Sequence, residues 1–121
     1  MEITKLVQEN TNEQAAIFSA LADPTRLKLV KLLCRQRDPD ALCVTALASL
    51  LGVTQSATSQ HLRVLRSVGL VKGERRGYHI HYYINPEALR RCHSFLSLAL
   101  EMAETCPEEP CKDYCPPDRL T

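Results

Sequence analysis

Apolar residues recur at helical spacing through the first half of the chain and predict four helices. Residues with strong capping preferences mark several ends: Asp23-Pro24 opens the second helix, Gly52 closes the third, and Thr54 caps the fourth. The expected helices span residues 11–22 (capped by Thr11 or Asn12), 24–34, about 41–51 and 55–68, and the stripe expected to be buried on the second is Leu27, Val30, Leu33 and Cys34.

The period of the pattern then changes from helical to alternating. Residues 70–71 and 79–84 are rich in β-formers, and Gly73 and Gly77 bracket a polar turn between them. This pattern predicts a two-stranded hairpin.

A last helix is expected from Pro86 to about residue 105. It is apolar over more than one face, which indicates burial against a partner. We therefore expect a mainly α fold with a β-hairpin in one domain over residues 1–105. Residues 106–121, rich in cysteine and proline, form a separate tail in this division of the chain.

Charge is distributed unevenly along the chain, although its formal net value is only +1. Residues 54–84 carry five Lys and Arg against one Glu, whereas residues 101–121 carry six acids against two bases. An acidic tail thus masks a basic middle, and the basic stretch is the part that can displace counterions from nucleic-acid phosphates.

Two helices joined by a short turn at Gly52 and followed by a basic hairpin form the arrangement of a winged helix-turn-helix DNA-binding protein. Short polar side chains near the start of the second helix can reach base edges, and glutamine there can pair with adenine. Arginines further along the helix can meet phosphates. The residues expected to contact double-stranded DNA are Thr54, Gln55, Ser56, Ser59, Gln60, His61, Arg63 and Arg66 on the helix, and Arg75, Arg76 and Tyr78 on the hairpin.

The chain resembles the ArsR/SmtB family of winged-helix repressors over residues 21 to about 100. The resemblance rests on DPTR at 23–26, SQHL-x-x-L at 59–65, GLV at 69–71 and RRGYHIHY at 75–82. It implies a homodimer built on the first and last helices, and repression at an operator near the protein's own gene. It also implies release of DNA when a metal, a metalloid or another inducer binds.

Two inducer sites known in that family are incomplete in this sequence. Arsenic and cadmium/lead sensors often carry Cys-Val-Cys at the start of the third helix, where this chain keeps only Cys43. Zinc sensors place ligands along the last helix, and the residues around Cys92 and His93 do not align with them. We expect Cys43 and Cys92 to be small buried residues that contribute to an inducer site only secondarily.

The tail offers a third candidate site, made by Cys106, Cys111 and Cys115 within ten residues. Thiolates are soft ligands that suit As(III), Cd(II), Pb(II), Zn(II) and Hg(II). Three thiolates without a histidine fit pyramidal As(III) or Sb(III), whereas a fourth ligand from Cys43, Cys92 or a second protomer would suit tetrahedral zinc or cadmium. We predict As(III) as the inducer, with the other thiophilic metals as alternatives.

The same thiols have other possible uses. They could form a disulfide or polysulfide in a redox- or sulfide-sensing repressor, or hold an iron–sulfur cluster. They could also be incidental thiols of the tail, so these alternatives stay open.

Several other classes of function are not indicated. The chain has four glycines and no phosphate-cradling loop, no metalloprotease motif and no separate catalytic set, so we expect no enzyme and no required cofactor. No apolar run is long enough to span a membrane, and the N-terminus lacks the pattern of a signal peptide. We therefore expect a cytoplasmic protein without a membrane partner. A module that binds something other than DNA is the remaining alternative.

Overall fold

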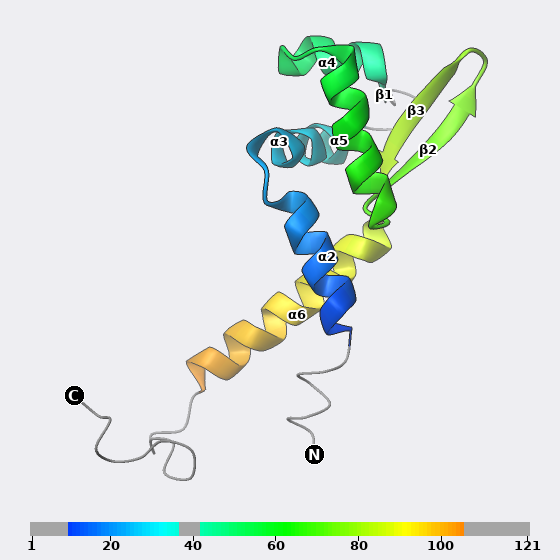
Figure 1. The fold of residues 1–121 in the computed structure, drawn as a ribbon. Helices are drawn as coiled ribbons and strands as arrows, with labels where there is room; N and C mark the ends of the chain where they lie inside the picture. Colours follow the sequence, from blue (N-terminus) through cyan, green and yellow to red (C-terminus); the bar gives the residue numbers. More distant parts are fainter. Residues whose placement is uncertain (1–9, 37–41, 106–121) are drawn as a thin grey trace.

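The structure, a computed structural model, describes residues 10–36 and 42–105 (Figure 1). In these ranges it contains five helices and a three-stranded antiparallel sheet with the order β1-β3-β2. The helices are α2 (Thr11–Leu21), α3 (Pro24–Arg35), α4 (Val44–Leu51), α5 (Gln55–Ser67) and α6 (Pro86–Glu104), and the strands are β1 (Leu42–Cys43), β2 (Val71–Arg76) and β3 (His79–Ile84).

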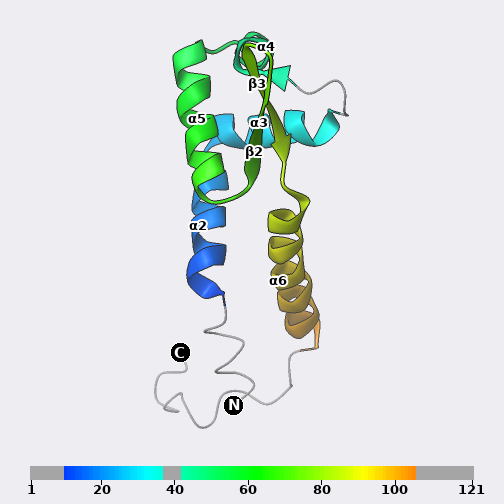
Figure 2. The same cartoon turned by 90° about the vertical axis from the view of Figure 1, so that its right-hand side faces the viewer.

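The described elements occupy two ends of an elongated molecule. Helices α3, α4 and α5 gather with the sheet at one end, and the β2–β3 hairpin projects beside α5. Helices α2 and α6 extend toward the other end, as a view turned by 90° also shows (Figure 2). The hairpin and α5 therefore lie together, and the far end of α6 lies away from both.

Local sequence signals set the helix boundaries around the helix-turn-helix. The Asp23 carboxylate accepts hydrogen bonds from the backbone N–H groups of Thr25 and Arg26, both at 3.0 Å, and so caps α3 as expected. At the end of α4, Gly52 adopts the left-handed conformation with φ 69°, which a glycine reaches without a Cβ penalty. The two helices of the motif are therefore separated by a turn that the sequence specifies.

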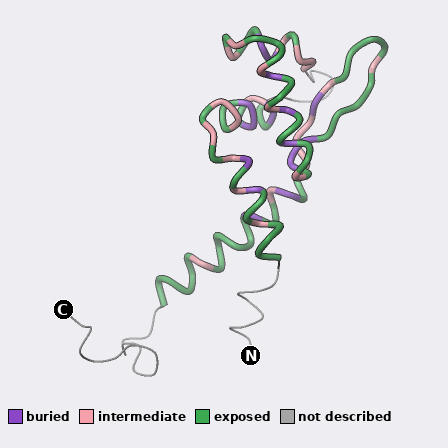
Figure 3. The backbone as a smooth tube through the Cα atoms, viewed as in Figure 1, coloured by how far each residue is buried: buried purple, intermediate pink, exposed green. Residues whose placement is uncertain are grey.

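The hydrophobic core lies where α3, α4, α5 and the base of the sheet meet. Leu29, Leu47 and Leu65 are completely buried there, and the buried segments of the chain converge on this point (Figure 3). Ile17 and Ala20 of α2 and Ala88 and Cys92 of α6 extend the same cluster toward the other end of the molecule. One continuous core thus connects the helix-turn-helix to the two outer helices.

Asn85 connects the start of α6 to the end of α5. Its side-chain amide donates to the carbonyl of Gly69 at 2.9 Å, and its backbone N–H donates to the carbonyl of Leu70 at 2.8 Å. Its side-chain oxygen accepts from the backbone N–H of Glu87 at 3.3 Å and so caps α6. A single residue therefore fixes the position of α6 relative to the residues that follow α5.

The structure corrects the predicted buried stripe of α3. Its buried residues are Leu29, Val30 and Leu33, whereas Leu27 and Cys34 are exposed. The prediction was wrong at these two positions because leucine and cysteine occur on several faces of this helix, so the apolar pattern alone did not mark the face that meets the core.

Two further boundaries differ from the sequence-based expectation. Helix α2 is capped by Asn10 in a left-handed conformation, without a side-chain cap bond, rather than by Thr11 or Asn12. Gly73 lies inside β2, so the hairpin turn is tighter than expected and contains Gly77, with φ 64°, and Tyr78. A two-residue turn with glycine at positive φ joins the strands of many hairpins.

The short strand β1 replaces what was expected to be the start of the third helix. Leu42 and Cys43 pair with Tyr82 and His81 of β3. The Gln36 side chain donates to the carbonyl of Tyr82 and accepts from the backbone N–H of Leu42. These are contacts between residues distant in sequence, which local patterns do not reveal.

Two leucines of α4 give a matched test of the core. Leu47 is fully buried, whereas Leu50 is 62% exposed on the same helix. We expect Leu47→Ala to lower the free energy of unfolding by about 2–5 kcal/mol, because it leaves a cavity, and Leu50→Ala to change it by less than about 0.5 kcal/mol. Denaturant unfolding at one fixed protein concentration measures both, and equal losses would contradict this account of the core.

Candidate nucleic-acid interface

Helix α5 is anchored by one face and presents the opposite face to solvent. Thr58, Leu62 and Leu65 are buried at helical spacing. The residues predicted to read DNA on the other side, Thr54, Gln55, Ser56, Ser59, Gln60 and Arg63, are all exposed. The structure therefore brings together, on one surface, six of the residues predicted from this segment.

Hydrogen bonds fix the N-terminal end of α5, where base edges would be reached. The Thr54 hydroxyl accepts from the backbone N–H of Ala57 at 3.0 Å, and the buried Thr58 hydroxyl donates to the carbonyl of Thr54 at 2.9 Å. The polar residues of the first turn thus project from a rigid support.

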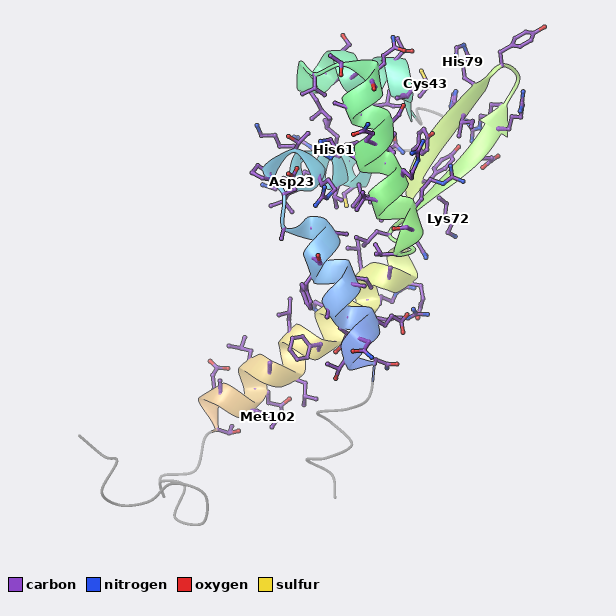
Figure 4. All side chains as sticks on the ribbon, in the orientation of Figure 1. Asp23, Cys43, His61, Lys72, His79 and Met102 are labelled. Carbon is purple, nitrogen blue, oxygen red and sulfur yellow. The ribbon has the colours of Figure 1, made fainter. Side chains whose placement is uncertain are left out.

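His61 occupies a different position from the other predicted contacts on α5. It is half-buried and lies near Asp23, the cap of α3 (Figure 4). The hydrogen bond from the backbone N–H of Arg26 is the main cause that lowers the pKa of the Asp23 carboxyl, and His61 is a smaller one. His61 therefore lies on the side of α5 that is turned toward the start of α3.

The two arginines predicted on the hairpin lie on opposite faces of the sheet. Arg75 is exposed, pairs in register with Ile80, and shares its face with the buried Val71. Arg76 lies on the other face, with its guanidinium 5.4 Å from the centroid of the Tyr83 ring and 3.9 Å from a carboxylate oxygen of Glu74. Arg75 thus shares the face that meets α5, and Arg76 does not.

The turn of the hairpin presents Tyr78 to solvent. This side chain is 97% exposed, the largest exposed fraction among the large hydrophobic residues that the structure describes. An aromatic ring held at the tip of a basic hairpin is suited to contact a nucleic-acid groove or backbone.

A groove of about 540 Å³ separates α5 from the hairpin. Ser59, Arg63 and Arg66 line it from one side of α5, and Tyr82 of β3 lines the other side. The serines and arginines along this groove can donate hydrogen bonds to an anion, so the groove suits a phosphate of a nucleic-acid backbone.

The described cysteines do not form a ligand cluster. Cys43 is half-buried in β1, and burial raises the pKa of the Cys92 thiol on α6. Within residues 10–36 and 42–105, no three His, Cys, Asp or Glu residues are grouped so that they could hold a metal ion. Cys106, Cys111 and Cys115, the three ligands predicted in the tail, lie outside the described residues.

Among the described helices, none combines the length and the apolar composition that a membrane-spanning helix would need. This covers α6, the longest of them, whose sequence alternates between apolar stretches and charged residues.

The fold and its exposed polar helix define a winged helix-turn-helix protein. Residues 23–72 match the model of the bacterial regulatory protein, arsR family. A relative that is 33% identical and covered over 71% of its length, an arsenic resistance regulator, also carries the family's name, so the chain belongs to the ArsR family. This is a family of DNA-binding transcriptional regulators and not of enzymes.

Three similar proteins illustrate the relationship. The transcriptional repressor SmtB homolog of Synechocystis is 46% identical over 61% of this chain, and the match spans about half of that protein (53%). The arsenic resistance transcriptional regulator ArsR2 of Pseudomonas putida is 33% identical, over 70% of this chain and 71% of that protein. The homodimeric winged helix-turn-helix DNA-binding domain of a possible ArsR-family regulator from Mycobacterium bovis is 25% identical, with a TM-score of 0.59 over 83% of this chain and 89% of that one.

Sequence reasoning missed how some residues of this region are used. It took Gly73 as one end of a turn, whereas Gly73 faces α5, and it did not anticipate that Asn85 bonds to the turn after α5. The opposite directions of Arg75 and Arg76 follow from strand alternation, so correct strand boundaries would have revealed them. The long-range bonds of Asn85 leave no local signal.

Proposed function

We propose that the chain is a repressor that binds operator DNA through α5 and the β2–β3 hairpin. The observation that carries this proposal is the exposed polar face of α5, from Gln55 to Arg63, opposite a face fixed in the core. In this assignment Gln55, Ser56 and Ser59 approach base edges in the major groove. The hairpin, through Arg75 and Tyr78, contacts the neighbouring backbone or minor groove.

We further propose that two copies act together as a homodimer through α2 and α6. Phe18 and Phe95 join these helices by an edge-on ring contact with centroids 6.0 Å apart, and Arg91 forms an ion pair with Glu13. From Phe95 to its end, α6 leaves a row of apolar side chains with exposed fractions between 40% and 61%: Phe95, Leu96, Leu98, Leu100 and Met102. Such a row on one helix suits burial against a second copy, and the solved relative from Mycobacterium bovis is homodimeric.

The proposed inducer is As(III), bound by Cys106, Cys111 and Cys115, which follow α6 directly in the sequence. Asn85 supports a mechanical route from α6 to the DNA-reading helix, because it bonds to Gly69 immediately after α5. A shift of α6 on ligand binding would therefore displace α5 and change the separation of two recognition helices. The arsenic resistance in the name of ArsR2 of Pseudomonas putida is compatible with As(III), and because other relatives are named as cadmium resistance regulators, Cd(II) is the first alternative.

DNA binding is tested by the salt dependence of affinity for the promoter fragment of the protein's own gene. We expect Arg63→Ala to weaken binding and to reduce the slope of log affinity against log salt by about one unit per protomer, because one phosphate contact is lost. Arg90→Ala is the matched control, since Arg90 lies on α6 in a surface ion pair with Glu87. Wild-type binding that does not respond to salt would contradict phosphate contact.

Inducer sensing is tested by replacing Cys106, Cys111 and Cys115 together with serine. We expect the variant to bind the promoter fragment as the wild type does, and arsenite to release the wild type but not the variant. A parallel titration with Cd(II), Pb(II), Zn(II), Hg(II) and an oxidant identifies the alternative inducers. Cys34→Ser is the control, because Cys34 is an exposed thiol of α3 distant in sequence from the tail. Full release of the triple variant by arsenite would exclude the tail as the site.

A further inference from the structure

A glycine lies at the contact between the end of α5 and the hairpin. Gly73 pairs in register with Tyr82, and its inner side faces α5. A methyl group built on Gly73 would lie 3.5 Å from the guanidinium carbon of Arg66, 3.4 Å from Cε1 of Tyr82 and 3.0 Å from Cγ2 of Ile80. The guanidinium of Arg66 therefore lies over the bare backbone of β2, close to the Tyr82 ring.

This arrangement distinguishes Arg66 from Arg63, which lines the same groove. Both arginines come from α5, but only Arg66 is among the nearest neighbours of the Gly73 position. Arg66 lies in the last turn of α5, where its positive charge also complements the carbonyl end of the helix. Its planar guanidinium can rest flat against a strand and an aromatic ring in a way that a lysine ammonium cannot.

The connections that hold the hairpin lie mainly at its base, where β1 pairs with Tyr82 and His81 of β3 and the Gln36 side chain donates to the Tyr82 carbonyl. From Lys72 to Ile80 the residues of the hairpin are exposed, apart from the half-buried Arg76, which lies near Glu74 and Tyr83 on the other face of the sheet. Val71 and Tyr82 hold the base of the hairpin in the core. Gly73 follows Val71 on the face toward α5 and pairs with Tyr82, so a contact between Arg66 and this position acts where the base joins the exposed part of the hairpin.

We propose that Arg66 is a positioning residue that sets the angle of the hairpin to the recognition helix, and that Gly73 leaves the space in which Arg66, Ile80 and Tyr82 lie together, since a methyl group there would come within 3.0 Å of Cγ2 of Ile80. The inference rests on the proposed DNA-binding function. It assigns to Arg66 an effect on affinity that passes through the DNA contacts of the hairpin, in addition to any attraction between its charge and a phosphate.

A double-mutant cycle separates this role from simple charge. The probe is a labelled duplex selected from a random-sequence pool by the full-length, reduced wild-type chain. Arg66→Lys keeps the charge but loses the guanidinium that lies near Gly73, and we expect it to weaken binding roughly threefold to tenfold, within the range of coupling between contacting residues. In a background with Arg75→Ala and Tyr78→Ala, which removes the hairpin's DNA contacts, the same change should weaken binding less than twofold.

Two further variants complete the test. Gly73→Ala should show the same dependence on the hairpin contacts as Arg66→Lys, with an unfolding midpoint close to that of the wild type. Arg63→Lys is the matched comparison, and its effect should be the same fold-change in both backgrounds.

The outcomes distinguish failure of the positioning role from failure of the proposed DNA-binding function. Equal fold-changes for Arg66→Lys in the two backgrounds would overturn the positioning role while leaving DNA binding intact. Failure of the wild-type chain to select any duplex would instead overturn the proposed function.

Discussion

The burial of Thr58, Leu62 and Leu65 is the constraint on which the rest of the interface depends. These three side chains fix both the rotation and the depth of α5, because each is completely or almost completely removed from solvent. Because one face of α5 is fixed in the core, its opposite face, with the polar residues between Gln55 and Arg63, points outward. The buried residues of α5 thus determine which of its other residues are exposed to a partner. The exposed residues themselves do not set the orientation of the helix.

The C-terminal end of α5 is where the parts of the molecule meet. Gly69, just after the helix, is bonded to Asn85 at the start of α6, and Arg66 lies over Gly73 of the hairpin. The helix proposed for dimerisation and the hairpin proposed for DNA contact are therefore both joined to α5 within one turn of its end. From such an arrangement we expect a small displacement of α6 to change the orientation of α5, because a packed core transmits displacements instead of absorbing them.

Much of the fold could be predicted because its signals are local. The Asp23 cap, the left-handed Gly52 and the Thr54 cap are properties of short stretches, and the structure has all three. Strand β1, the exposure of Leu27 and the bonds of Asn85 could not be predicted, because each depends on a residue distant in sequence. For the candidate site, the exposure of the polar residues of α5 from Gln55 to Arg63, apart from His61, follows from the local pattern, whereas the position of His61 beside Asp23 follows from how α5 packs against α3. The contacts that these residues make with DNA remain predictions.

The most direct test of sequence reading by α5 is a comparison of affinities across a set of duplexes in which each operator base pair is replaced in turn. The account predicts that Gln55→Ala loses about 1–3 kcal/mol of discrimination at one position of each half-site and keeps it elsewhere, because one side chain reads one base. Arg63→Ala should lower affinity for all the duplexes by a similar factor, because a phosphate contact carries no sequence information. A Gln55→Ala variant that discriminates as the wild type does at every position, together with unchanged preferences in Ser56→Ala and Ser59→Ala, would contradict the assignment of α5 as the helix that reads DNA.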